Sequence, residues 1–519
     1  MNEAENKIKE ILENVKSKLN PNGRTRVFED KKEISSEFMV ESSEPEAFTK
    51  EFIIEKVFNF LELEKLPEKQ FETPTGKDRS VDYRIKNQKG DIFLVETKPI
   101  NAELFDKSKD GAVNQIKSLF KLVEVRDKYK FGIATDGLKW VFVNKEGKVI
   151  DKEGNALKER KEKKGVLHLI TLERLYQESD YEEIRARLTG EESEVLKLIK
   201  KIKKTGEPLS KLEEKLDIKI HNGITAESTK IETLNKIFII DQHILSASMG
   251  IFSADIIKPI LRKEDINRWG YTFRKFYLIY SYFSEEEEIK KHKTVYEYLE
   301  QHKNELEHSH QWHKLEPHQP WYMLRECEYY QEQLEKEKIV VVLNETKDIY
   351  FPIIPKGFFV EKCMFFITGK EKDLKIVSLI LQSRLCQFMC CAVERRIKEV
   401  PIKIPFDKTP FVLLCDHMLF LNETEEHRNS EKEMIEFFDR QIINSLVYEL
   451  YFADELKTNL INLVSPYLAD ISNLDSDSEK LNTIKKTHQY LKSNKEILDT
   501  ITTIKNHERV KIIEQENKN

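Results

Sequence analysis

The segment Ser80–Pro99, SVDYRIKNQKGDIFLVETKP, decides the fold of the N-terminal part of the chain. Its two halves, Val81–Ile85 and Ile92–Lys98, are rich in β-branched and aromatic residues, which favour strands. The polar residues between them end in Gly90, which can adopt a positive φ in a tight turn. The segment therefore predicts a β-hairpin.

Three side chains with catalytic potential lie on this hairpin. Glu96 and Lys98 are two residues apart, so the alternation of a strand directs both side chains to one face. A turn centred near Lys89 would place Asp82 opposite Glu96, where cross-strand Cβ atoms lie about 5 Å apart. Two carboxylates and one ammonium group are therefore expected to converge.

Such a convergence suits a divalent cation. Neighbouring carboxylates repel each other and raise each other's pKa, and a bound cation relieves that repulsion. Oxygen ligands favour Mg²⁺, which polarises a phosphoryl group and lowers the pKa of a bound water that a lysine can orient. The pattern indicates phosphodiester hydrolysis. An exposed hairpin whose charges pair across the strands would show the same spacing, so this motif alone leaves both interpretations open.

The neighbouring segments favour the catalytic interpretation. Residues 111–125, GAVNQIKSLFKLVEV, have the apolar spacing of an amphipathic helix, and residues 44–63, EPEAFTKEFIIEKVFNFLEL, precede the hairpin. The dipeptide Asp136-Gly137 then marks a second hairpin. This order of elements resembles the PD-(D/E)xK nuclease fold, specifically the N-terminal nuclease of type I restriction subunits and their fused type II relatives. The resemblance covers about residues 44–175.

The resemblance implies a role for each residue of the hairpin motif. Asp82 and Glu96 would be the ligands of Mg²⁺, and Lys98 would be the catalytic lysine. The proline of the motif's name is absent, because Ser80-Val81 stands before Asp82.

Two further elements of the family are matched in part. Gln115 corresponds to the glutamine of the family's QxxxY element, whose tyrosine position is occupied by Leu119 here. Glu46 falls where the opening helix often carries an additional acidic residue. Glu51 or Glu55 could fill that place instead, so the assignment stays open among the three.

The sequence pattern changes near His221. Strand-like, aromatic-rich segments recur and predict a mixed, β-rich region: NKIFIID, FYLIYSYF, KIVVVLN, DIYFPIIP and GFFVEKCMFFITG. Three other phrases occur among them: ADIIKPILRKEDINRW at Ala254–Trp269, PWYMLRECEYY at Pro320–Tyr330 and DLKIVSLILQSRLCQFM at Asp373–Met389. Their succession resembles the C-terminal specificity domain of TaqI-like adenine methyltransferases and type IIG restriction enzymes, over about residues 222–425. In that family the domain reads the DNA target sequence.

A domain that reads DNA needs cations and amides that reach phosphates and base edges. One basic cluster, interleaved with Trp269, Tyr271 and Phe273, supplies candidates for DNA contact. They are Lys258, Arg262, Lys263, Arg268, Arg274 and Lys275. Solvated charges beside core aromatic residues would give the same pattern, so both interpretations stay open.

Composition and charge limit the classes of protein to which the chain can belong. The 519 residues predict about three domains, and the net charge of −6 means that DNA contact must come from local basic patches. The six cysteines lack the paired spacing of a zinc site or a disulfide framework, which fits a reduced cytoplasm. Met1–Lys18 reads as a charged amphipathic helix, not a secretion signal. Leu374–Val393 carries too many polar residues to span a bilayer and predicts a buried core helix.

Together these observations predict an α+β multidomain protein. The expected parts are a helical leader (1–43), a PD-(D/E)xK nuclease domain (44–175), a helical linker (176–221), a TaqI-like target-recognition domain (222–429) and a helical C-terminal region (430–519). The interval 176–221 is too short for a methyltransferase, and neither a glycine-rich S-adenosylmethionine segment nor an NPPY-like tetrapeptide occurs in the sequence. Host protection would therefore need a separate DNA methyltransferase.

The function expected from this organisation is that of a type II restriction endonuclease, which cleaves double-stranded DNA with Mg²⁺. A homodimer is expected at the moment of cleavage, because one nuclease site hydrolyses one strand at a time. Two alternatives stay open. One is a non-catalytic DNA-binding specificity protein with a vestigial nuclease domain, and the other is a nuclease directed at modified bases.

Overall fold

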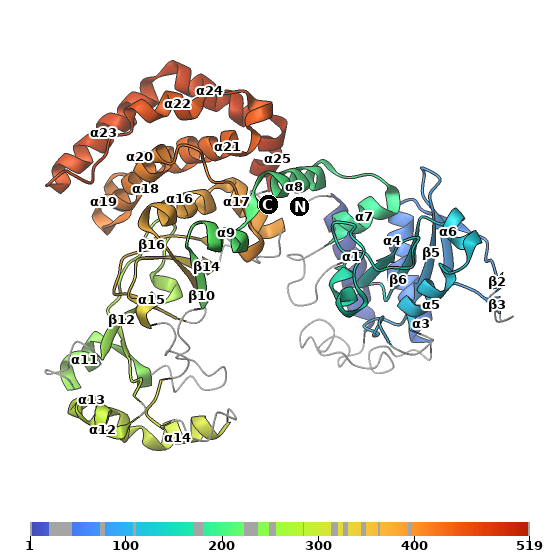
Figure 1. Ribbon diagram of the computed structural model, residues 1–519, viewed down its shortest axis with the longest axis horizontal. Coiled ribbons are helices and arrows are strands. Elements are labelled where there is room, and N and C mark those ends of the chain that lie inside the picture. The colour runs from blue at the N-terminus through green and yellow to red at the C-terminus, as the bar shows by residue number, and fades with distance from the viewer. Residues whose placement is uncertain are drawn as a thin grey trace. The chain divides into compact units, whose positions relative to one another are not determined.

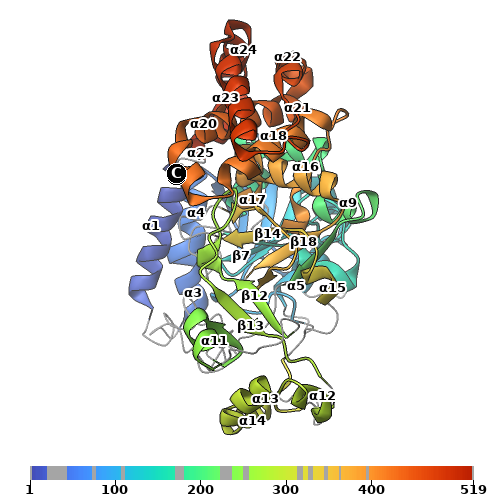
Figure 2. The same ribbon diagram turned by 90° about the vertical axis from the view of Figure 1, so that its left-hand side faces the viewer.

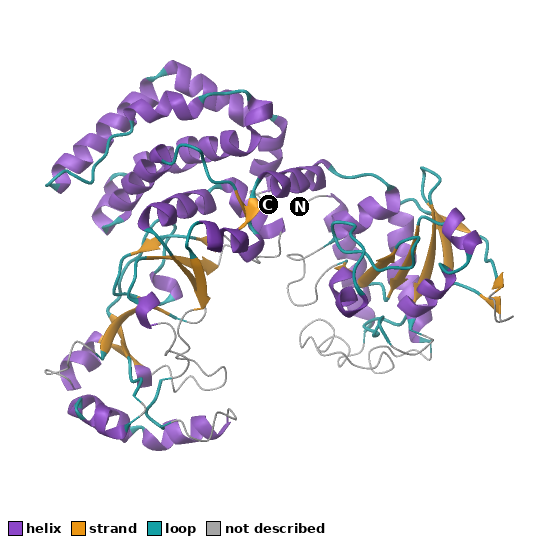
Figure 3. Cartoon of the chain, in the orientation of Figure 1, coloured by secondary structure: helices purple, strands orange, loops and turns teal. Residues whose placement is uncertain are grey.

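The computed structural model describes residues 3–19, 44–72, 78–106, 111–169, 180–222, 237–248, 256–283, 285–312, 320–324, 331–343, 349–361, 364–392 and 397–516. The chain divides into two compact units between Lys201 and Ile202 (Figure 1). Helices and strands occur in both units (Figure 3). The predicted α+β multidomain class is therefore confirmed.

A six-stranded sheet organises the first unit, with strand order β1-β4-β5-β6-β7-β8. β5 and β6 are parallel, and the other neighbours pair in antiparallel fashion. The strands are β1 (Glu64–Leu66), β4 (Tyr83–Lys86), β5 (Ile92–Thr97), β6 (Phe131–Thr135), β7 (Lys139–Val143) and β8 (Val166–His168), with β2 (Phe71–Glu72) and β3 (Asp78–Arg79) as a separate pair.

Helices pack against both faces of this sheet. One core contains α1 (Glu3–Lys18), α7 (Tyr181–Thr189) and a continuous helix made of α3 (Pro45–Thr49), η3 (Lys50–Ile54) and α4 (Glu55–Phe60). The other contains α5 (Ala112–Leu119) and α6 (Val123–Lys128). The first unit also has η4 (Glu159–Gly165), and the boundary between the two units falls within α8 (Glu194–Thr205). Along β5, Phe93 and Val95 belong to the first core and Leu94 to the second, as a period of two requires.

The first unit includes parts that the sequence analysis assigned to a leader (1–43) and a linker (176–221). The apolar face of α1, with Leu12 and Val15, is buried in the core that η3 and α4 share. Ile184 of α7 is buried in the same core. Amphipathic helices are stable when that face is covered, which is why both helices dock on the sheet.

Two sheets form the β-rich part of the second unit. One has β10 (Lys219–Asn222), β18 (Phe365–Thr368), β14 (Lys338–Leu343), β15 (Ile349–Tyr350) and β16 (Ile353–Ile354), and the other has β11 (Ile239–Asp241), β13 (Phe276–Ile279), β12 (Ile257–Leu261) and β17 (Phe359–Val360). β9 (Glu207–Pro208) pairs with β19 (Pro401–Ile402). Each of the five predicted strand-like segments contains at least one of these strands.

The second unit is layered (Figures 1 and 2). Its two sheets lie between α12–α14 at one end and the C-terminal helices at the other. The helices before β14 are α9 (Leu209–Lys215), α11 (Gln242–Ser248), η5 (Lys263–Asp265), α12 (Glu286–Lys290), α13 (Lys293–Gln301), α14 (Lys303–Trp312) and α15 (Gln331–Leu334). Those after β18 are α16 (Glu371–Gln382), α17 (Arg384–Ala392), η6 (Ile397–Glu399), α18 (Thr409–Asn422), α19 (Glu425–Ser430), α20 (Lys432–Phe437), η7 (Phe438–Ile443), α21 (Asn444–Leu456), α22 (Leu460–Val464), η8 (Ser465–Tyr467), α23 (Asp477–Ser493), α24 (Lys495–Asn506) and α25 (Glu508–Glu516).

From Leu374 to Cys390 the apolar run is buried as predicted, apart from the half-buried Lys375 and Arg384, but it forms two helices instead of one. Ser383, with ψ of 155°, interrupts the helical backbone between α16 and α17. Cys386 and Cys390 on α17 are buried. Across the described ranges, no helix combines the length and apolarity needed to cross a membrane.

Gly132 on β6 lets α5 lie close to the sheet. A Cβ atom at this position would collide with Ile116 Cγ2 and with the ring of Phe120. We expect Gly132→Ala to lower the free energy of unfolding by about 1–3 kcal/mol, because α5 has to move away from β6. Urea denaturation measures this change, and an unchanged unfolding midpoint would contradict the close packing.

Candidate active site

The predicted hairpin is present, with the predicted register. Tyr83 on β4 pairs with Val95 on β5, so the next pair in this register is Asp82 with Glu96. Gly90 in the connecting turn has a φ of 88°, the conformation expected of a glycine there. The register places the two carboxylates on adjoining strands at the same end of the hairpin.

Asp82 lies just before β4, although the sequence predicts a strand from Val81. Its Oδ2 accepts one hydrogen bond from the backbone N–H of Thr97, at 2.6 Å, and one from Thr97 Oγ1, at 2.7 Å. The Asp82 carboxylate thus accepts the hydrogen bond from Thr97 N–H that a backbone carbonyl group would accept if β4 continued. The hydrogen-bonded ladder between β4 and β5 therefore stops here. This double contact fixes the Asp82 carboxylate at the end of β5.

Glu96 is buried, with 7% of its surface exposed. Lys98 Nζ donates a hydrogen bond to Glu96 Oε1 at 3.1 Å, so the two side chains project from the same face of β5, as predicted. Burial, together with the negative charge of Asp82, raises the pKa of Glu96 to about 7 against the opposing effect of Lys98. The site therefore holds a carboxyl group that changes its charge near neutral pH.

Lys50 is a member of the site that the sequence analysis missed. Its Nζ lies 2.6 Å from Asp82 Oδ1 and 2.8 Å from Glu46 Oε1. Glu46 precedes it by four residues on the same helix, a spacing at which glutamate and lysine side chains meet. This spacing is the feature of the sequence that could have identified Lys50 as a neighbour of Glu46. Despite partial burial, the hydrogen bonds to Asp82 and Glu46 raise the pKa of Lys50, so it is a cation.

Of the three glutamates considered on the opening helix, the structure brings Glu46 to the site. Thr97 Oγ1 lies 3.4 Å from Glu46 Oε1. Glu51 is exposed, and Glu55 accepts a hydrogen bond from the Tyr83 hydroxyl at 3.0 Å.

Gln115 lies on α5, which packs against β5 and β6. It is half-buried, and Ile116 beside it is fully buried in the core that also contains Leu94. Since Leu94 and Glu96 share a face of β5, Gln115 lies on the helix that covers the Glu96 face. Leu119, at the tyrosine position, is part of the same apolar core.

The donor atoms at this site fit Mg²⁺. In the described part of the chain, no group of three His, Cys, Asp or Glu side chains is arranged to hold a metal by itself. Mg²⁺ needs only one or two protein carboxylates, because water and substrate phosphate supply its other ligands. Asp82 and Glu96 offer such a pair, since they lie at the same end of the hairpin, and the negative charge of Asp82 contributes to the raised pKa of Glu96.

Four of the six candidate DNA-contacting side chains in the second unit form ion pairs. The pairs are Lys258–Glu335 at 3.2 Å, Arg262–Glu361 at 3.4 Å, Arg268–Asp439 at 2.9 Å and Arg274–Asp265 at 2.5 Å. Arg268 also donates to the carbonyl oxygen of Gln382, which ties it to the end of α16. Lys263 lies on η5, and Lys275 is exposed with a φ of 60°. Ion pairing reduces the charge that these four side chains offer to DNA.

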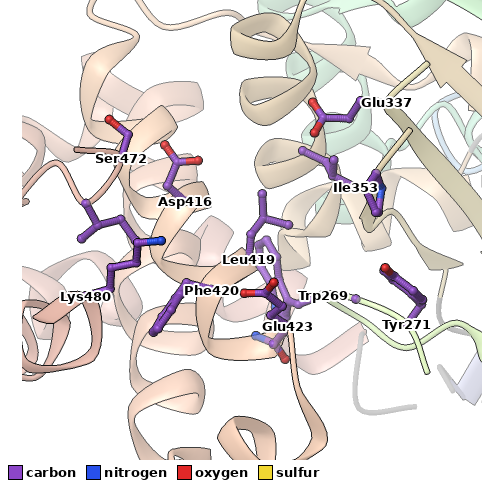
Figure 4. A pocket seen from close by; sticks show the side chains of 14 residues that line it. Trp269, Tyr271, Glu337, Ile353, Asp416, Leu419, Phe420, Glu423, Ser472 and Lys480 are labelled. Atoms are coloured by element: carbon purple, nitrogen blue, oxygen red, sulfur yellow. The ribbon is translucent and has the colours of Figure 1, made fainter. Parts of the chain in front are cut away.

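Two aromatic residues of this cluster, Trp269 and Tyr271, line a cavity in the second unit. Trp269 is buried, and with Tyr271 it lines a cavity of about 340 Å³ (Figure 4). Three carboxylates, those of Glu337, Asp416 and Glu423, line the same cavity together with one lysine. Carboxylates repel phosphate groups, so this cavity is poorly suited to the DNA backbone.

The pKa of Glu96 predicts a pH-dependent stability. The folded pKa of about 7 lies above the ordinary value of 4.5, so the unfolded chain releases this proton first as pH rises. Stability of the metal-free protein is therefore lost between about pH 4.5 and 7 through this group. We expect Glu96→Gln to stabilise the protein in EDTA by about 1–3 kcal/mol at pH 8, and to have little effect at pH 4.5. Urea denaturation at both pH values tests this, and an effect of equal size at both would contradict it.

Parts of the chain are similar to two restriction enzymes. No protein-family model matches it. A stretch of 115 residues, 22% of this chain, is 33% identical to a putative type II restriction enzyme and methyltransferase of Methanocaldococcus jannaschii, and it spans 9% of that protein's length. The type IIL restriction-modification enzyme MmeI, solved in complex with DNA, aligns with 53% of this chain and 36% of its own, at a TM-score of 0.27 and 9% identity.

Proposed function

We propose that the chain is a Mg²⁺-dependent endonuclease of the type II restriction class that hydrolyses phosphodiester bonds in double-stranded DNA. The observation that carries the proposal is the joint placement of Asp82, Glu96 and Lys98 at the end of β5. The 33% identity to a putative type II restriction enzyme and methyltransferase supports the same class. The PD-(D/E)xK motif gives each of these three residues its role.

In this proposal, Asp82 and Glu96 hold the metal ion. Mg²⁺, when bound, polarises the scissile phosphate and lowers the pKa of a bound water molecule. Thr97 keeps the Asp82 carboxylate in place through two hydrogen bonds. Glu96 has to release its proton to act as a ligand, which its pKa of about 7 allows at neutral pH.

Lys98 is the residue that acts on the reacting groups. Its ammonium group is held 3.1 Å from Glu96 Oε1, and 23% of its side chain is exposed. From there it orients the attacking water and stabilises the negative charge that develops on the phosphate. Gln115 and Glu46 are assigned supporting positions beside this centre.

The second unit is proposed to read the DNA target. Lys275 and Lys263 are the first candidates for phosphate contact, since the four other basic residues of the cluster are paired with carboxylates. One nuclease site hydrolyses one strand at a time, so a second copy of the chain joins when both strands are cut. Protection of host DNA is assigned to a separate methyltransferase.

Plasmid cleavage tests the proposed function. Incubation with Mg²⁺ is expected to give discrete fragments, and incubation with EDTA is expected to leave the plasmid intact. Binding to DNA without cleavage at any Mg²⁺ concentration would instead identify a non-catalytic specificity protein. Parallel digestion of methylated and unmethylated plasmid shows whether modified bases are the substrate.

Sedimentation of the protein with and without its target DNA tests whether a second copy of the chain joins on the DNA. We expect a mass corresponding to two chains on DNA that carries the recognition site and Ca²⁺ in place of Mg²⁺. A single chain that cuts both strands in one binding event would contradict this expectation.

A further inference from the structure

A positively charged side chain of the protein itself lies between the Asp82 carboxylate of the candidate metal site and the neighbouring carboxylate of Glu46. Lys50 Nζ contacts Asp82 Oδ1 at 2.6 Å and Glu46 Oε1 at 2.8 Å. The three side chains are 27%, 19% and 36% exposed in the order Lys50, Asp82 and Glu46, so solvent screens these contacts only in part. An ammonium group in this position neutralises the same Asp82 carboxylate that the proposed function assigns to Mg²⁺.

The backbone around Lys50 is held firmly against the site. Lys50 begins η3, a π-helical turn whose first carbonyl accepts a hydrogen bond from the N–H of Glu55. Turns of this kind inside α-helices occur frequently at functional sites. Thr49 is fully buried, and its Oγ1 accepts a hydrogen bond from the N–H of Ile100 at 2.7 Å, two residues beyond Lys98. The helix that carries Lys50 is therefore tied to the strand end that carries the catalytic lysine.

The two lysines of the site have different partners. Lys98 contacts Glu96, and Lys50 contacts Asp82 and Glu46. With all five groups ionised, three carboxylates and two ammonium groups leave a formal charge of −1. Removing Lys50 would leave −2, and adding a divalent cation while Lys50 stays would give +1. Lys50 and a metal ion therefore compete for the same negative charge.

We propose that Lys50 is a built-in counter-cation that holds Asp82 and Glu46 together in the metal-free protein and that Mg²⁺ must displace from Asp82. This inference rests on the proposed function, because it concerns the same metal site. Lys50 stabilises the folded protein before the metal arrives and weakens the apparent affinity for Mg²⁺. A higher concentration of the ion is therefore needed to fill the site.

Calorimetric titration with Mg²⁺ alone, in the full chain, tests this proposal. Lys50→Met is expected to bind Mg²⁺ about tenfold more tightly than the wild type, because the competing positive charge is gone. The same variant is expected to melt at a lower temperature in EDTA, since Asp82 and Glu46 then repel each other, and to show a larger rise in melting temperature on adding Mg²⁺. Lys50→Gln serves the same test if the methionine variant does not fold.

Lys130→Met is the matched control. Lys130 forms a lysine–carboxylate pair of the same length, 2.6 Å to Asp91 Oδ2, in the same unit. Its removal is expected to change stability without changing the affinity for Mg²⁺. Lys50→Arg, which keeps the positive charge, is expected to keep the wild-type affinity.

The outcomes separate this inference from the proposed function. One outcome is that the wild type binds Mg²⁺ and cuts DNA, while folded Lys50→Met and Lys50→Gln bind Mg²⁺ no more tightly than the wild type. This outcome overturns the role of Lys50 as a counter-cation and leaves the proposed nuclease function in place. If neither the wild type nor any Lys50 variant binds Mg²⁺ or cuts DNA, both fail. Tighter binding of Mg²⁺ by Lys50→Met than by Lys130→Met supports the inference.

Discussion

Replacing Lys98 with alanine is expected to reduce the rate of DNA cleavage by at least about 10²–10³-fold while leaving DNA binding intact. The expected loss is large because a positioned ammonium group acts on the water and on the developing charge only during the reaction. Plasmid cleavage under single-turnover conditions measures the rate, and a gel-shift assay in Ca²⁺ measures binding.

Lys117→Ala is the matched control for this variant. Lys117 pairs with Glu162 at 2.6 Å, and these side chains are 21% and 11% exposed, close to the 23% and 9% of Lys98 and Glu96. The two variants therefore remove similar half-buried ion pairs from the same unit. Equal cleavage rates for Lys98→Ala and Lys117→Ala would show that Lys98 has no catalytic role.

Replacing Asp82 with asparagine is expected to weaken Mg²⁺ binding by at least about 10²-fold and to reduce cleavage in proportion. The amide oxygen can still accept hydrogen bonds from Thr97, so the geometry of the strand end is kept while the charge is lost. With Asp82 neutral, Glu96 is the one carboxylate of the proposed pair that still attracts the cation, so half of the negative charge that holds Mg²⁺ is lost. Titration calorimetry measures the affinity, and the initial rate of plasmid cleavage measures activity.

Asp91→Asn controls for the loss of a carboxylate elsewhere in the unit. Asp91 pairs with Lys130 on the surface of the same sheet, and its amide variant should bind Mg²⁺ like the wild type. Wild-type metal affinity in Asp82→Asn would exclude Asp82 as a ligand, whatever the effect on cleavage.

The hairpin was predictable because local chemistry determines it. The turn ending at Gly90 and the alternation of Phe93, Leu94 and Val95 between two cores fix the register, and a shift by one residue would expose the buried face. The placement of Asp82 and Glu96 at the same end of the hairpin follows from that register. For the same reason, the strand-like segments of the second unit could be located from sequence.

Contacts between distant segments were not predictable in this way. Lys50 meets Asp82 because a helix packs across the sheet, and no local pattern specifies that meeting. Arg262 and Arg268 read as free cations, but their partners Glu361 and Asp439 are about a hundred residues or more away in sequence. These two ion pairs come from tertiary packing alone.

The break between α16 and α17 had no sequence signal either. Ser383 stands in an apolar run without proline or glycine, so helical spacing predicts one helix through it. The Ser383 hydroxyl donates to the carbonyl oxygen of Ile380 at 2.7 Å, and the Asn444 side chain accepts from the N–H of Arg384 at 2.8 Å. The second bond comes from α21, 60 residues away, and supplies the acceptor that the interrupted helix lacks.

Anomalous diffraction from crystals soaked in Mn²⁺ tests most directly whether Asp82 and Glu96 hold a metal together. We predict one peak bonded to an oxygen of each carboxylate at about 2.1 Å, the distance typical of such hard cations, with Lys50 turned away from Asp82. No peak between the two carboxylates, at a Mn²⁺ concentration that supports DNA cleavage in solution, would contradict the proposed site.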